Sequence, residues 1–181
     1  MATTASARIA LLCQRYVHRY YTRCLALIRE GDEAGMSVPP FEPVEIRRRF
    51  PVAPHVLFDA WITSPVMRRW LFASDSGELV SIDVDPRVGG AFSIVERREE
   101  GEVEVDHFGT YIEVDRPGRL AFTLEVPWHF PGTTQVGVDI RPVPEGGEMF
   151  FRQTGVDPAT TRDAWHRMFD QLDEAISASS A

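Results

Sequence analysis

Hydrophobic residues recur at spacings of three and four positions near the end of the chain, from Asp157 to Ala178. This spacing places them on one face of a helix; they are Trp165, Met168, Phe169, Leu172 and Ile176. Asp157 can accept a hydrogen bond from the first free amides, and Pro158 suits the first helical position. The pattern predicts a C-terminal helix with one broad apolar face, which needs an equally wide apolar partner.

The segments before this helix alternate hydrophobic and polar residues, as is typical of strands with one buried face. A first strand is expected at Val44–Phe50, followed by two short helices at Ala53–Ile62 and Ser64–Leu71. Six more strands are expected after Gly77, separated by turns rich in Gly, Pro and acidic residues. We therefore predict an α+β fold, in which a curved, seven-stranded antiparallel sheet wraps around the long C-terminal helix.

One expected strand, Val103–Val114, changes the parity of its apolar positions. These residues stand first at odd and then at even positions: Val103, Val105, Phe108, Ile112 and Val114. A face with a period of two cannot switch parity without an extra residue. We therefore predict a β-bulge near Asp106–Phe108.

The beginning of the chain has a different pattern. Ser6–Glu30 has helical apolar spacing and many Arg, with no acidic residue before Glu30, which is typical of an organelle transit peptide or of a helix on a membrane surface. Gly31–Pro43 has the Gly and Pro content of a linker. The helical segment is expected to dock on its own domain or to pair two copies into a homodimer.

An alternative start at Met36 would make the preceding segment an over-extension of the gene. We divide the chain into an N-terminal extension (1–35), a linker (36–43) and one domain (44–178). The two cysteines, Cys13 and Cys24, both lie in the extension. They are expected to be free thiols in a reducing cytoplasm, with an intermolecular disulfide as the alternative.

The composition is that of a globular protein: 181 residues, 44% hydrophobic and 25% charged, with no apolar run that would span a membrane. All 19 basic residues are Arg, which indicates GC-rich coding and a bacterial source. The formal charge is −8, and residues 36–181 carry 14 Arg against 24 acidic residues, a balance of −10. This acidic balance argues against a nucleic-acid partner.

Few residues suggest chemistry. The five histidines are scattered without metal-ligand spacing, so we expect no metal and no cofactor. His107 and Asp106 are weak candidates for a general base, and His107 is better explained as a core or rim histidine. Arg48 falls in the buried register of the first strand. Its guanidinium either anchors a carboxylate ligand or pairs with an acid at the sheet end.

Three spaced motifs resemble the AHSA family, which is named after the activator of a heat-shock chaperone ATPase and belongs to the START-like SRPBCC superfamily. They are Arg48–Trp61 followed by Trp70, the Gly-Gly hairpin Asp85–Phe92, and Gly109–Pro117 with Leu120–Thr123. The resemblance covers residues 44–178 and implies the helix-grip fold. Eukaryotic activators carry an additional N-terminal domain that contacts the chaperone, and the extension does not resemble it.

The resemblance also implies a cavity between sheet and helix, where a small apolar ligand would bind. The residues expected to line it are Trp61, Trp70, Phe92, His107, Tyr111, Phe122, Trp128, Phe130, Phe151, Trp165 and Phe169. A filled aromatic core is the alternative. We expect binding of a small, largely apolar molecule with a role in stress or metabolism. The alternatives are an enzyme like a polyketide cyclase or dehydratase, with His107 or Asp106 as base, and a chaperone-interacting module.

Overall fold

The computed structural model describes residues 41–72, 77–98, 103–130 and 132–177. The sequence predictions for Ser6–Glu30, for most of the linker and for both cysteines lie outside these residues. The described chain forms seven strands and three helices, in the order β1 (Val44–Phe50), α2 (Pro54–Asp59), α3 (Ser64–Met67), β2 (Glu78–Val84), β3 (Ala91–Arg98), β4 (Val103–Asp115), β5 (Arg119–Leu124), β6 (Thr134–Val143), β7 (Gly146–Thr154) and α4 (Pro158–Ser177).

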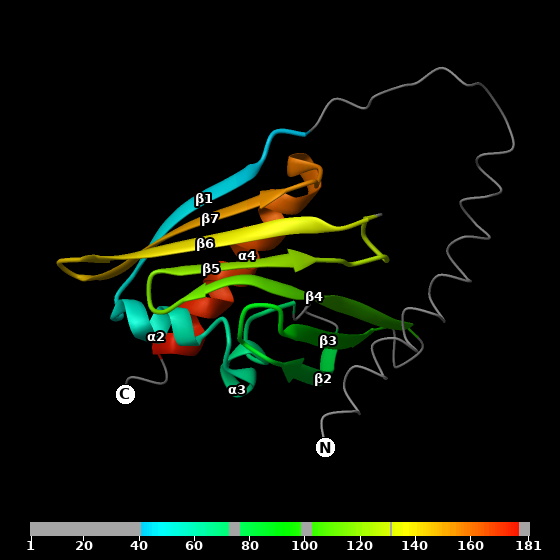
Figure 1. Ribbon diagram of the computed structural model, residues 1–181, viewed down its shortest axis with the longest axis horizontal. Helices are drawn as coiled ribbons and strands as arrows, with labels where there is room; N and C mark the ends of the chain where they lie inside the picture. Colours follow the sequence, from blue (N-terminus) through cyan, green and yellow to red (C-terminus); the bar gives the residue numbers. More distant parts are fainter. Residues whose placement is uncertain (1–40, 73–76, 99–102, 131, 178–181) are drawn as a thin grey trace, which may run out of the picture. The chain divides into compact units, whose positions relative to one another are not determined.

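The seven strands form a single antiparallel sheet in the order β1-β7-β6-β5-β4-β3-β2 (Figure 1). Strands β2 to β7 are consecutive in the chain, and each pairs with the next one in the sequence. β1, which comes first in the chain, closes the order by pairing with β7. The predicted fold class is confirmed: a curved sheet with a long C-terminal helix and two short helices after the first strand.

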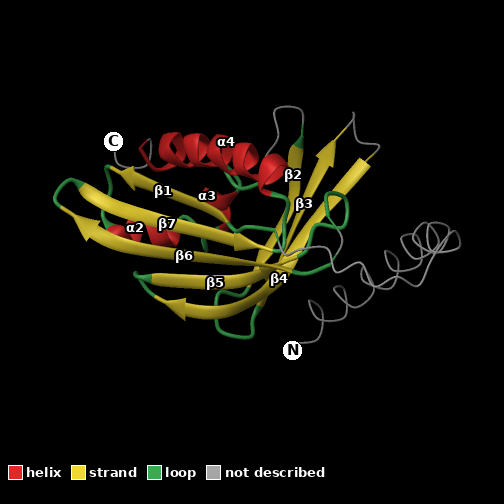
Figure 2. Ribbon diagram, turned by 90° about the horizontal axis from the view of Figure 1, so that it is seen from above, coloured by secondary structure: helices red, strands yellow, loops and turns green. Residues whose placement is uncertain are grey.

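Helix α4 covers one side of the sheet, and the sheet curls around that side (Figure 2). Asp157 caps the helix as predicted, because its Oδ1 accepts a hydrogen bond from the amide of Ala159 at 2.9 Å. The buried face consists of Trp165, Phe169, Leu172, Ala175 and Ile176. This face meets the apolar side chains that the strands alternately turn inward, and together they form the core of the domain.

The bulge predicted at Asp106–Phe108 is in the wrong place. β3 and β4 pair without interruption through this stretch, from Ala91↔Thr110 to Arg98↔Val103. The register of β4 shifts instead against β5, between Tyr111 and Glu113. The alternation of apolar residues predicted the wrong place because His107, which is polar, points inward, while Ile112, which is apolar, is exposed.

A chain of buried hydrogen bonds connects α4 to three strands. The indole Nε1 of Trp165 donates to Oε1 of Gln153 on β7 at 2.6 Å. Gln153 donates from Nε2 to Oγ1 of Thr134 on β6 at 3.1 Å, and Thr134 donates to the backbone oxygen of Leu124 on β5 at 2.8 Å. Because every member has a partner, this network orients α4 on the sheet without leaving a buried polar group unsatisfied.

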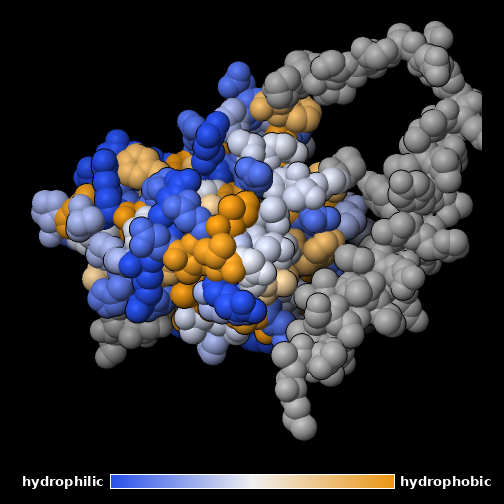
Figure 3. Space-filling model, viewed as in Figure 1, coloured by the Kyte–Doolittle hydropathy of each residue, from blue (hydrophilic) through white to orange (hydrophobic). Residues whose placement is uncertain are grey.

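The outer surface of the sheet faces the viewer in Figure 3. It carries many hydrophilic residues around a smaller hydrophobic area in the middle of the view. In the part of the chain that the structure describes, no helix is both long enough and apolar enough to cross a bilayer.

Candidate functional site

The aromatic residues expected to face inward come together between the sheet and α4. Eight of them are buried: Trp61, Trp70, Phe92, Tyr111, Phe122, Phe151, Trp165 and Phe169. Their rings are in mutual contact, with centroids 4.7 Å apart for Trp61 and Trp70 and 4.3 Å apart for Phe151 and Trp165. This part of the interior is therefore a packed aromatic cluster, held by edge and tilted contacts.

The two aromatic residues of the loop after β5 lie further out. The side chain of Trp128 is 57% exposed, and Phe130 is only partly buried. The backbone amides of His129 and Phe130 both donate to the carbonyl of Val126, which forms a tight turn. These two residues lie at the rim of the interior rather than within the packed cluster.

Beside the aromatic cluster, β3 and β4 turn polar side chains inward. The charged residues that follow Ile94 still belong to the sheet, because β3 continues to Arg98. Glu96 is fully buried (0% exposed), in the same inward register as Phe92 and Ile94. Its carboxylate accepts a hydrogen bond from Nε of Arg98 at 2.7 Å, and this partner makes its burial tolerable.

His107 lies next to this pair. It stands opposite Ile94 on β3, while Glu96 stands opposite Val105, so the imidazole and the buried carboxylate are diagonal neighbours on one face of the sheet. His107 is 3% exposed, and its Nδ1 has no hydrogen-bond partner. A buried ring nitrogen without a partner is unusual, because its desolvation is not compensated.

Burial controls the protonation of His107. Desolvation by burial is the largest effect and lowers its pKa to about 3; it outweighs the opposing charge of Glu96, and the charges of His129 and Arg98 add to the lowering. Burial also lowers the pKa of His129, and the positive charge of Arg98 lowers it further. At neutral pH the imidazole of His107 is therefore uncharged and offers hydrogen bonding without charge.

Phe72 covers the histidine. Its ring stacks on the imidazole with centroids 4.3 Å apart and an interplanar angle of 13°, and its amide donates to the sulfur of Met168 on α4. The backbone of Phe72 has φ 57°, in the left-handed region that residues with a Cβ adopt at a cost of about 1–2 kcal/mol. The neighbouring contacts hold this strained residue over His107.

The other two candidates from the sequence have different surroundings. Asp106 precedes His107 on a regular strand, so its side chain points to the opposite face of the sheet and cannot act beside the imidazole. Arg48 reaches α4, where NH1 lies 2.6 Å from Oδ1 of Asp170 and NH2 lies 3.5 Å from Oδ2 of Asp173. Two acids of the domain itself therefore balance the guanidinium of Arg48, although they lie on α4 and not at the end of the sheet, where a partner was expected.

Three buried side-chain atoms of the described residues have no hydrogen-bond partner: Nε1 of Trp61, Nδ1 of His107 and Oε1 of Gln171. They come from the segment after α2, from β4 and from α4. Within the same residues, no three His, Cys, Asp or Glu side chains are grouped so that they could hold a metal ion. The chemistry available inside the domain is therefore hydrogen bonding to a neutral histidine and an indole, within aromatic surroundings.

Sequence reasoning missed Glu96, Arg98 and Phe72 as members of this site. A signal for Glu96 was present, because it continues the alternation of Phe92 and Ile94, but its charge suggested a turn. No local pattern predicts the position of Phe72, since its contacts to His107 and Met168 join residues far apart in the chain.

Solved structures share this architecture. An AHSA1-like protein from Aeromonas hydrophila is 22% identical, with a TM-score of 0.68 over 77% of this chain and 94% of that one. A protein from Rhodobacter sphaeroides is 25% identical, with a TM-score of 0.64 over 75% and 93% of the two chains. CalU16 from Micromonospora echinospora is 16% identical, with a TM-score of 0.56 over 76% and 78%.

No curated protein matches the sequence. The profile of the family described as "Activator of Hsp90 ATPase homolog 1-like protein" matches residues 51–177, which span all elements from α2 to α4. The motifs, the fold and this profile agree. The chain belongs to the AHSA1-like family of helix-grip proteins.

Proposed function

We propose that this domain binds a small, largely apolar molecule between the sheet and α4, with one polar group of the ligand held at His107. The observation that carries the proposal is the buried Nδ1 of His107, which has no partner within the domain. A ligand that supplies the complementary group would remove the cost of this unsatisfied atom, which is about 1–3 kcal/mol.

The surroundings of His107 support a ligand with little charge. The imidazole is neutral at physiological pH because burial lowers its pKa to about 3. The carboxylate of Glu96 is fully buried close by and would repel an anion. Phe72 and Trp165, whose ring centroids lie 6.0 Å apart, provide apolar contacts at the same place. A hydroxyl or amide group on an aromatic or aliphatic body satisfies these constraints.

The catalytic alternative receives less support from the same geometry. A general base works best with a pKa near the operating pH, and burial lowers that of His107 to about 3. The ring is also sealed beneath Phe72 and 3% exposed. Both features argue against proton abstraction by His107.

Native mass spectrometry of gently purified protein, together with a thermal-shift screen of lipids and aromatic compounds, tests the proposal. We expect a bound mass or an increase in melting temperature for neutral amphipathic compounds. The variant His107→Phe should lose this shift, while the control His166→Gln, at an exposed position on α4, should keep it. If neither method detects a ligand, or if both variants respond alike, the interior is simply a packed core.

A further inference from the structure

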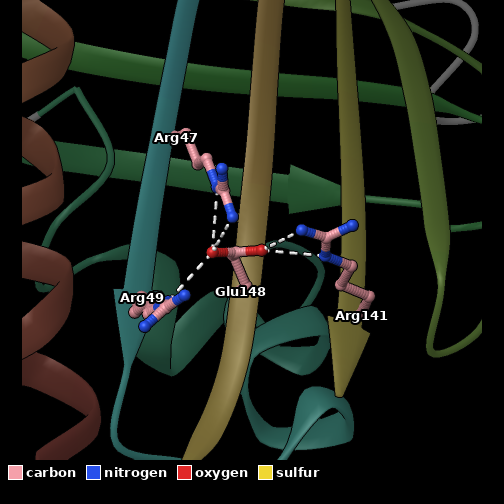
Figure 4. Close-up of polar contacts among 4 residues, drawn as sticks. All are labelled: Arg47, Arg49, Arg141 and Glu148. Atoms are coloured by element: carbon pink, nitrogen blue, oxygen red, sulfur yellow. Dashed lines mark hydrogen bonds and ion pairs between the residues drawn. The ribbon is translucent and has the colours of Figure 1, made fainter. Parts of the chain in front are cut away.

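A second group of charged residues lies on the outer face of the sheet, on the side away from α4. Glu148 of β7 stands directly opposite Arg49 of β1 and opposite Arg141 of β6, so the three residues form one row across three strands. Arg47 of β1 reaches the same carboxylate from the next outward position (Figure 4). We call Arg47, Arg49 and Arg141, with Glu148 at their centre, the arginine cluster.

All three guanidinium groups are held by the single carboxylate. Oε1 of Glu148 accepts from Nε of Arg47 at 2.9 Å and from Nε of Arg49 at 3.0 Å, and Oε2 accepts from Nε of Arg141 at 2.8 Å. The side chain of Glu148 is 1% exposed, whereas those of the three arginines are 55%, 71% and 56% exposed. The arginines therefore cover the carboxylate and remain open to solvent.

The cluster has an excess of positive charge. Burial by itself would raise the pKa of Glu148, but hydrogen bonds from Arg49, Arg141 and Arg47 outweigh it and lower the pKa to about 2. The carboxylate is thus ionised at neutral pH, and three positive charges against one negative charge leave +2. This excess stands out on a chain whose residues 36–181 have a balance of −10.

Holding the strands together does not require this arrangement. The three arginine side chains are each more than half exposed, and a third guanidinium at one carboxylate adds repulsion between like charges. Each guanidinium carries five N–H donors, and the contacts to Glu148 use one or two of them. The remaining donors are held in place and accessible, which prepares them for an external acceptor.

An aromatic ring lies among the same side chains. Phe150 of β7 is partly buried, with the guanidinium carbon of Arg47 at 5.1 Å and that of Arg141 at 4.5 Å from its centroid. Arginine and aromatic side chains together are typical of the residues that contribute most to protein–protein contacts. The surface therefore combines positive charge with a rigid apolar contact.

We propose that the arginine cluster docks an acidic, extended segment of a protein partner. The guanidinium groups extend over two strand spacings, about 10 Å from β1 to β6, which is wider than a single oxyanion. The central position is already taken by the carboxylate of Glu148. Carboxylates at alternate positions of an extended segment lie about 7 Å apart, and they can reach Arg49 and Arg141 on either side of Glu148.

Fluorescence anisotropy with a short, labelled poly-glutamate peptide at low ionic strength tests the proposal on the full chain. We expect saturable binding that weakens with added salt. The double variant Arg49→Gln/Arg141→Gln should bind about tenfold more weakly. The matched control Arg87→Gln/Arg97→Gln removes the same charge at two exposed positions, one between β2 and β3 and one on β3. It should bind as the wild type does.

A measurement on the unaltered protein keeps the test independent of the stability of the variants. Addition of the peptide should shift the arginine Nε–H resonances of Arg47, Arg49 and Arg141 in NMR spectra, and not that of Arg87. The proposal is overturned if the wild type does not bind, if the control loses as much affinity, if inorganic phosphate at the same concentration of charge competes fully, or if the peptide perturbs other arginines instead. Dimer formation that depends on Arg49 and Arg141 in size-exclusion chromatography would also overturn it, because a second copy would then cover the surface.

Discussion

His107 makes the stability of the domain depend on pH. The histidine has an ordinary pKa of 6.5 in the unfolded chain and about 3 in the folded one, because burial disfavours the charged ring. Between these values the unfolded state binds the proton and the folded state does not. The free energy of unfolding should therefore decrease as pH falls below 6.5, by about 1.4 kcal/mol per pH unit from this group.

Chemical denaturation at a series of pH values measures this effect. The variant His107→Gln should flatten the decrease between pH 6.5 and the range in which carboxylates begin to titrate, while His166→Gln should leave it unchanged. An equal slope in all three proteins would show that His107 is protonated in the folded state, in contradiction to its burial.

Glu148 responds at lower pH. Hydrogen bonds from three arginines overcome the effect of burial and lower its pKa from 4.5 to about 2, so its contribution to stability is present above pH 4.5 and is lost as pH falls toward 2. Replacement by Gln should lower the melting temperature at neutral pH, since three guanidinium groups then repel one another without a counter-charge. The same change should reduce the loss of stability on acidification.

Thermal unfolding monitored by circular dichroism tests this prediction. Glu104→Gln is a suitable control, because Glu104 also pairs with an arginine but its side chain is 54% exposed. If Glu104→Gln lowers the melting temperature as much as Glu148→Gln, the convergence of three arginines on Glu148 has no special effect.

At the scale of the elements, the hydrogen bond from Trp165 to Gln153 should stabilise the docking of α4 on the sheet. Trp165→Phe removes the indole donor and leaves Oε1 of Gln153 buried without its partner, which costs about 1–3 kcal/mol beyond the change in packing. Trp61→Phe is a matched control, since the indole of Trp61 is equally buried but has no hydrogen-bond partner.

Urea denaturation of the two variants compares these costs directly. We expect the free energy of unfolding to fall further for Trp165→Phe than for Trp61→Phe. Equal losses would mean that both indoles contribute through packing alone.

At the scale of the whole molecule, we expect the domain to fold without residues 1–35. The buried hydrophobic residues of the described chain all lie between Val44 and Ile176. A protein that begins at Met36 should therefore melt within about 2 °C of the full-length chain. Differential scanning calorimetry of both proteins makes the comparison, and a clearly lower melting temperature of the shorter one would show that residues 1–35 contribute to the stability of the domain.

Local pattern was sufficient for most of the architecture. The spacing of Trp165, Phe169, Leu172 and Ile176 predicted the buried face of α4, and period-two alternation predicted the strands, because the repeat of each element places its apolar residues on one side. The capping role of Asp157 was also visible in the sequence, since it depends only on the residues that follow it.

The polar sites depended on tertiary structure. Glu96 and Glu148 are charged residues that a sequence pattern assigns to the surface. The buried charge of Glu96 is compensated by Arg98 of its own strand, and that of Glu148 by arginines that strand pairing brings near. The position of the bulge and the burial of His107 beneath Phe72 also depend on pairing between distant segments. The sequence by itself determined which faces are apolar, because periodicity is local. Only the folded chain decided which charges meet, because the free energy of burying a charge depends on its partners.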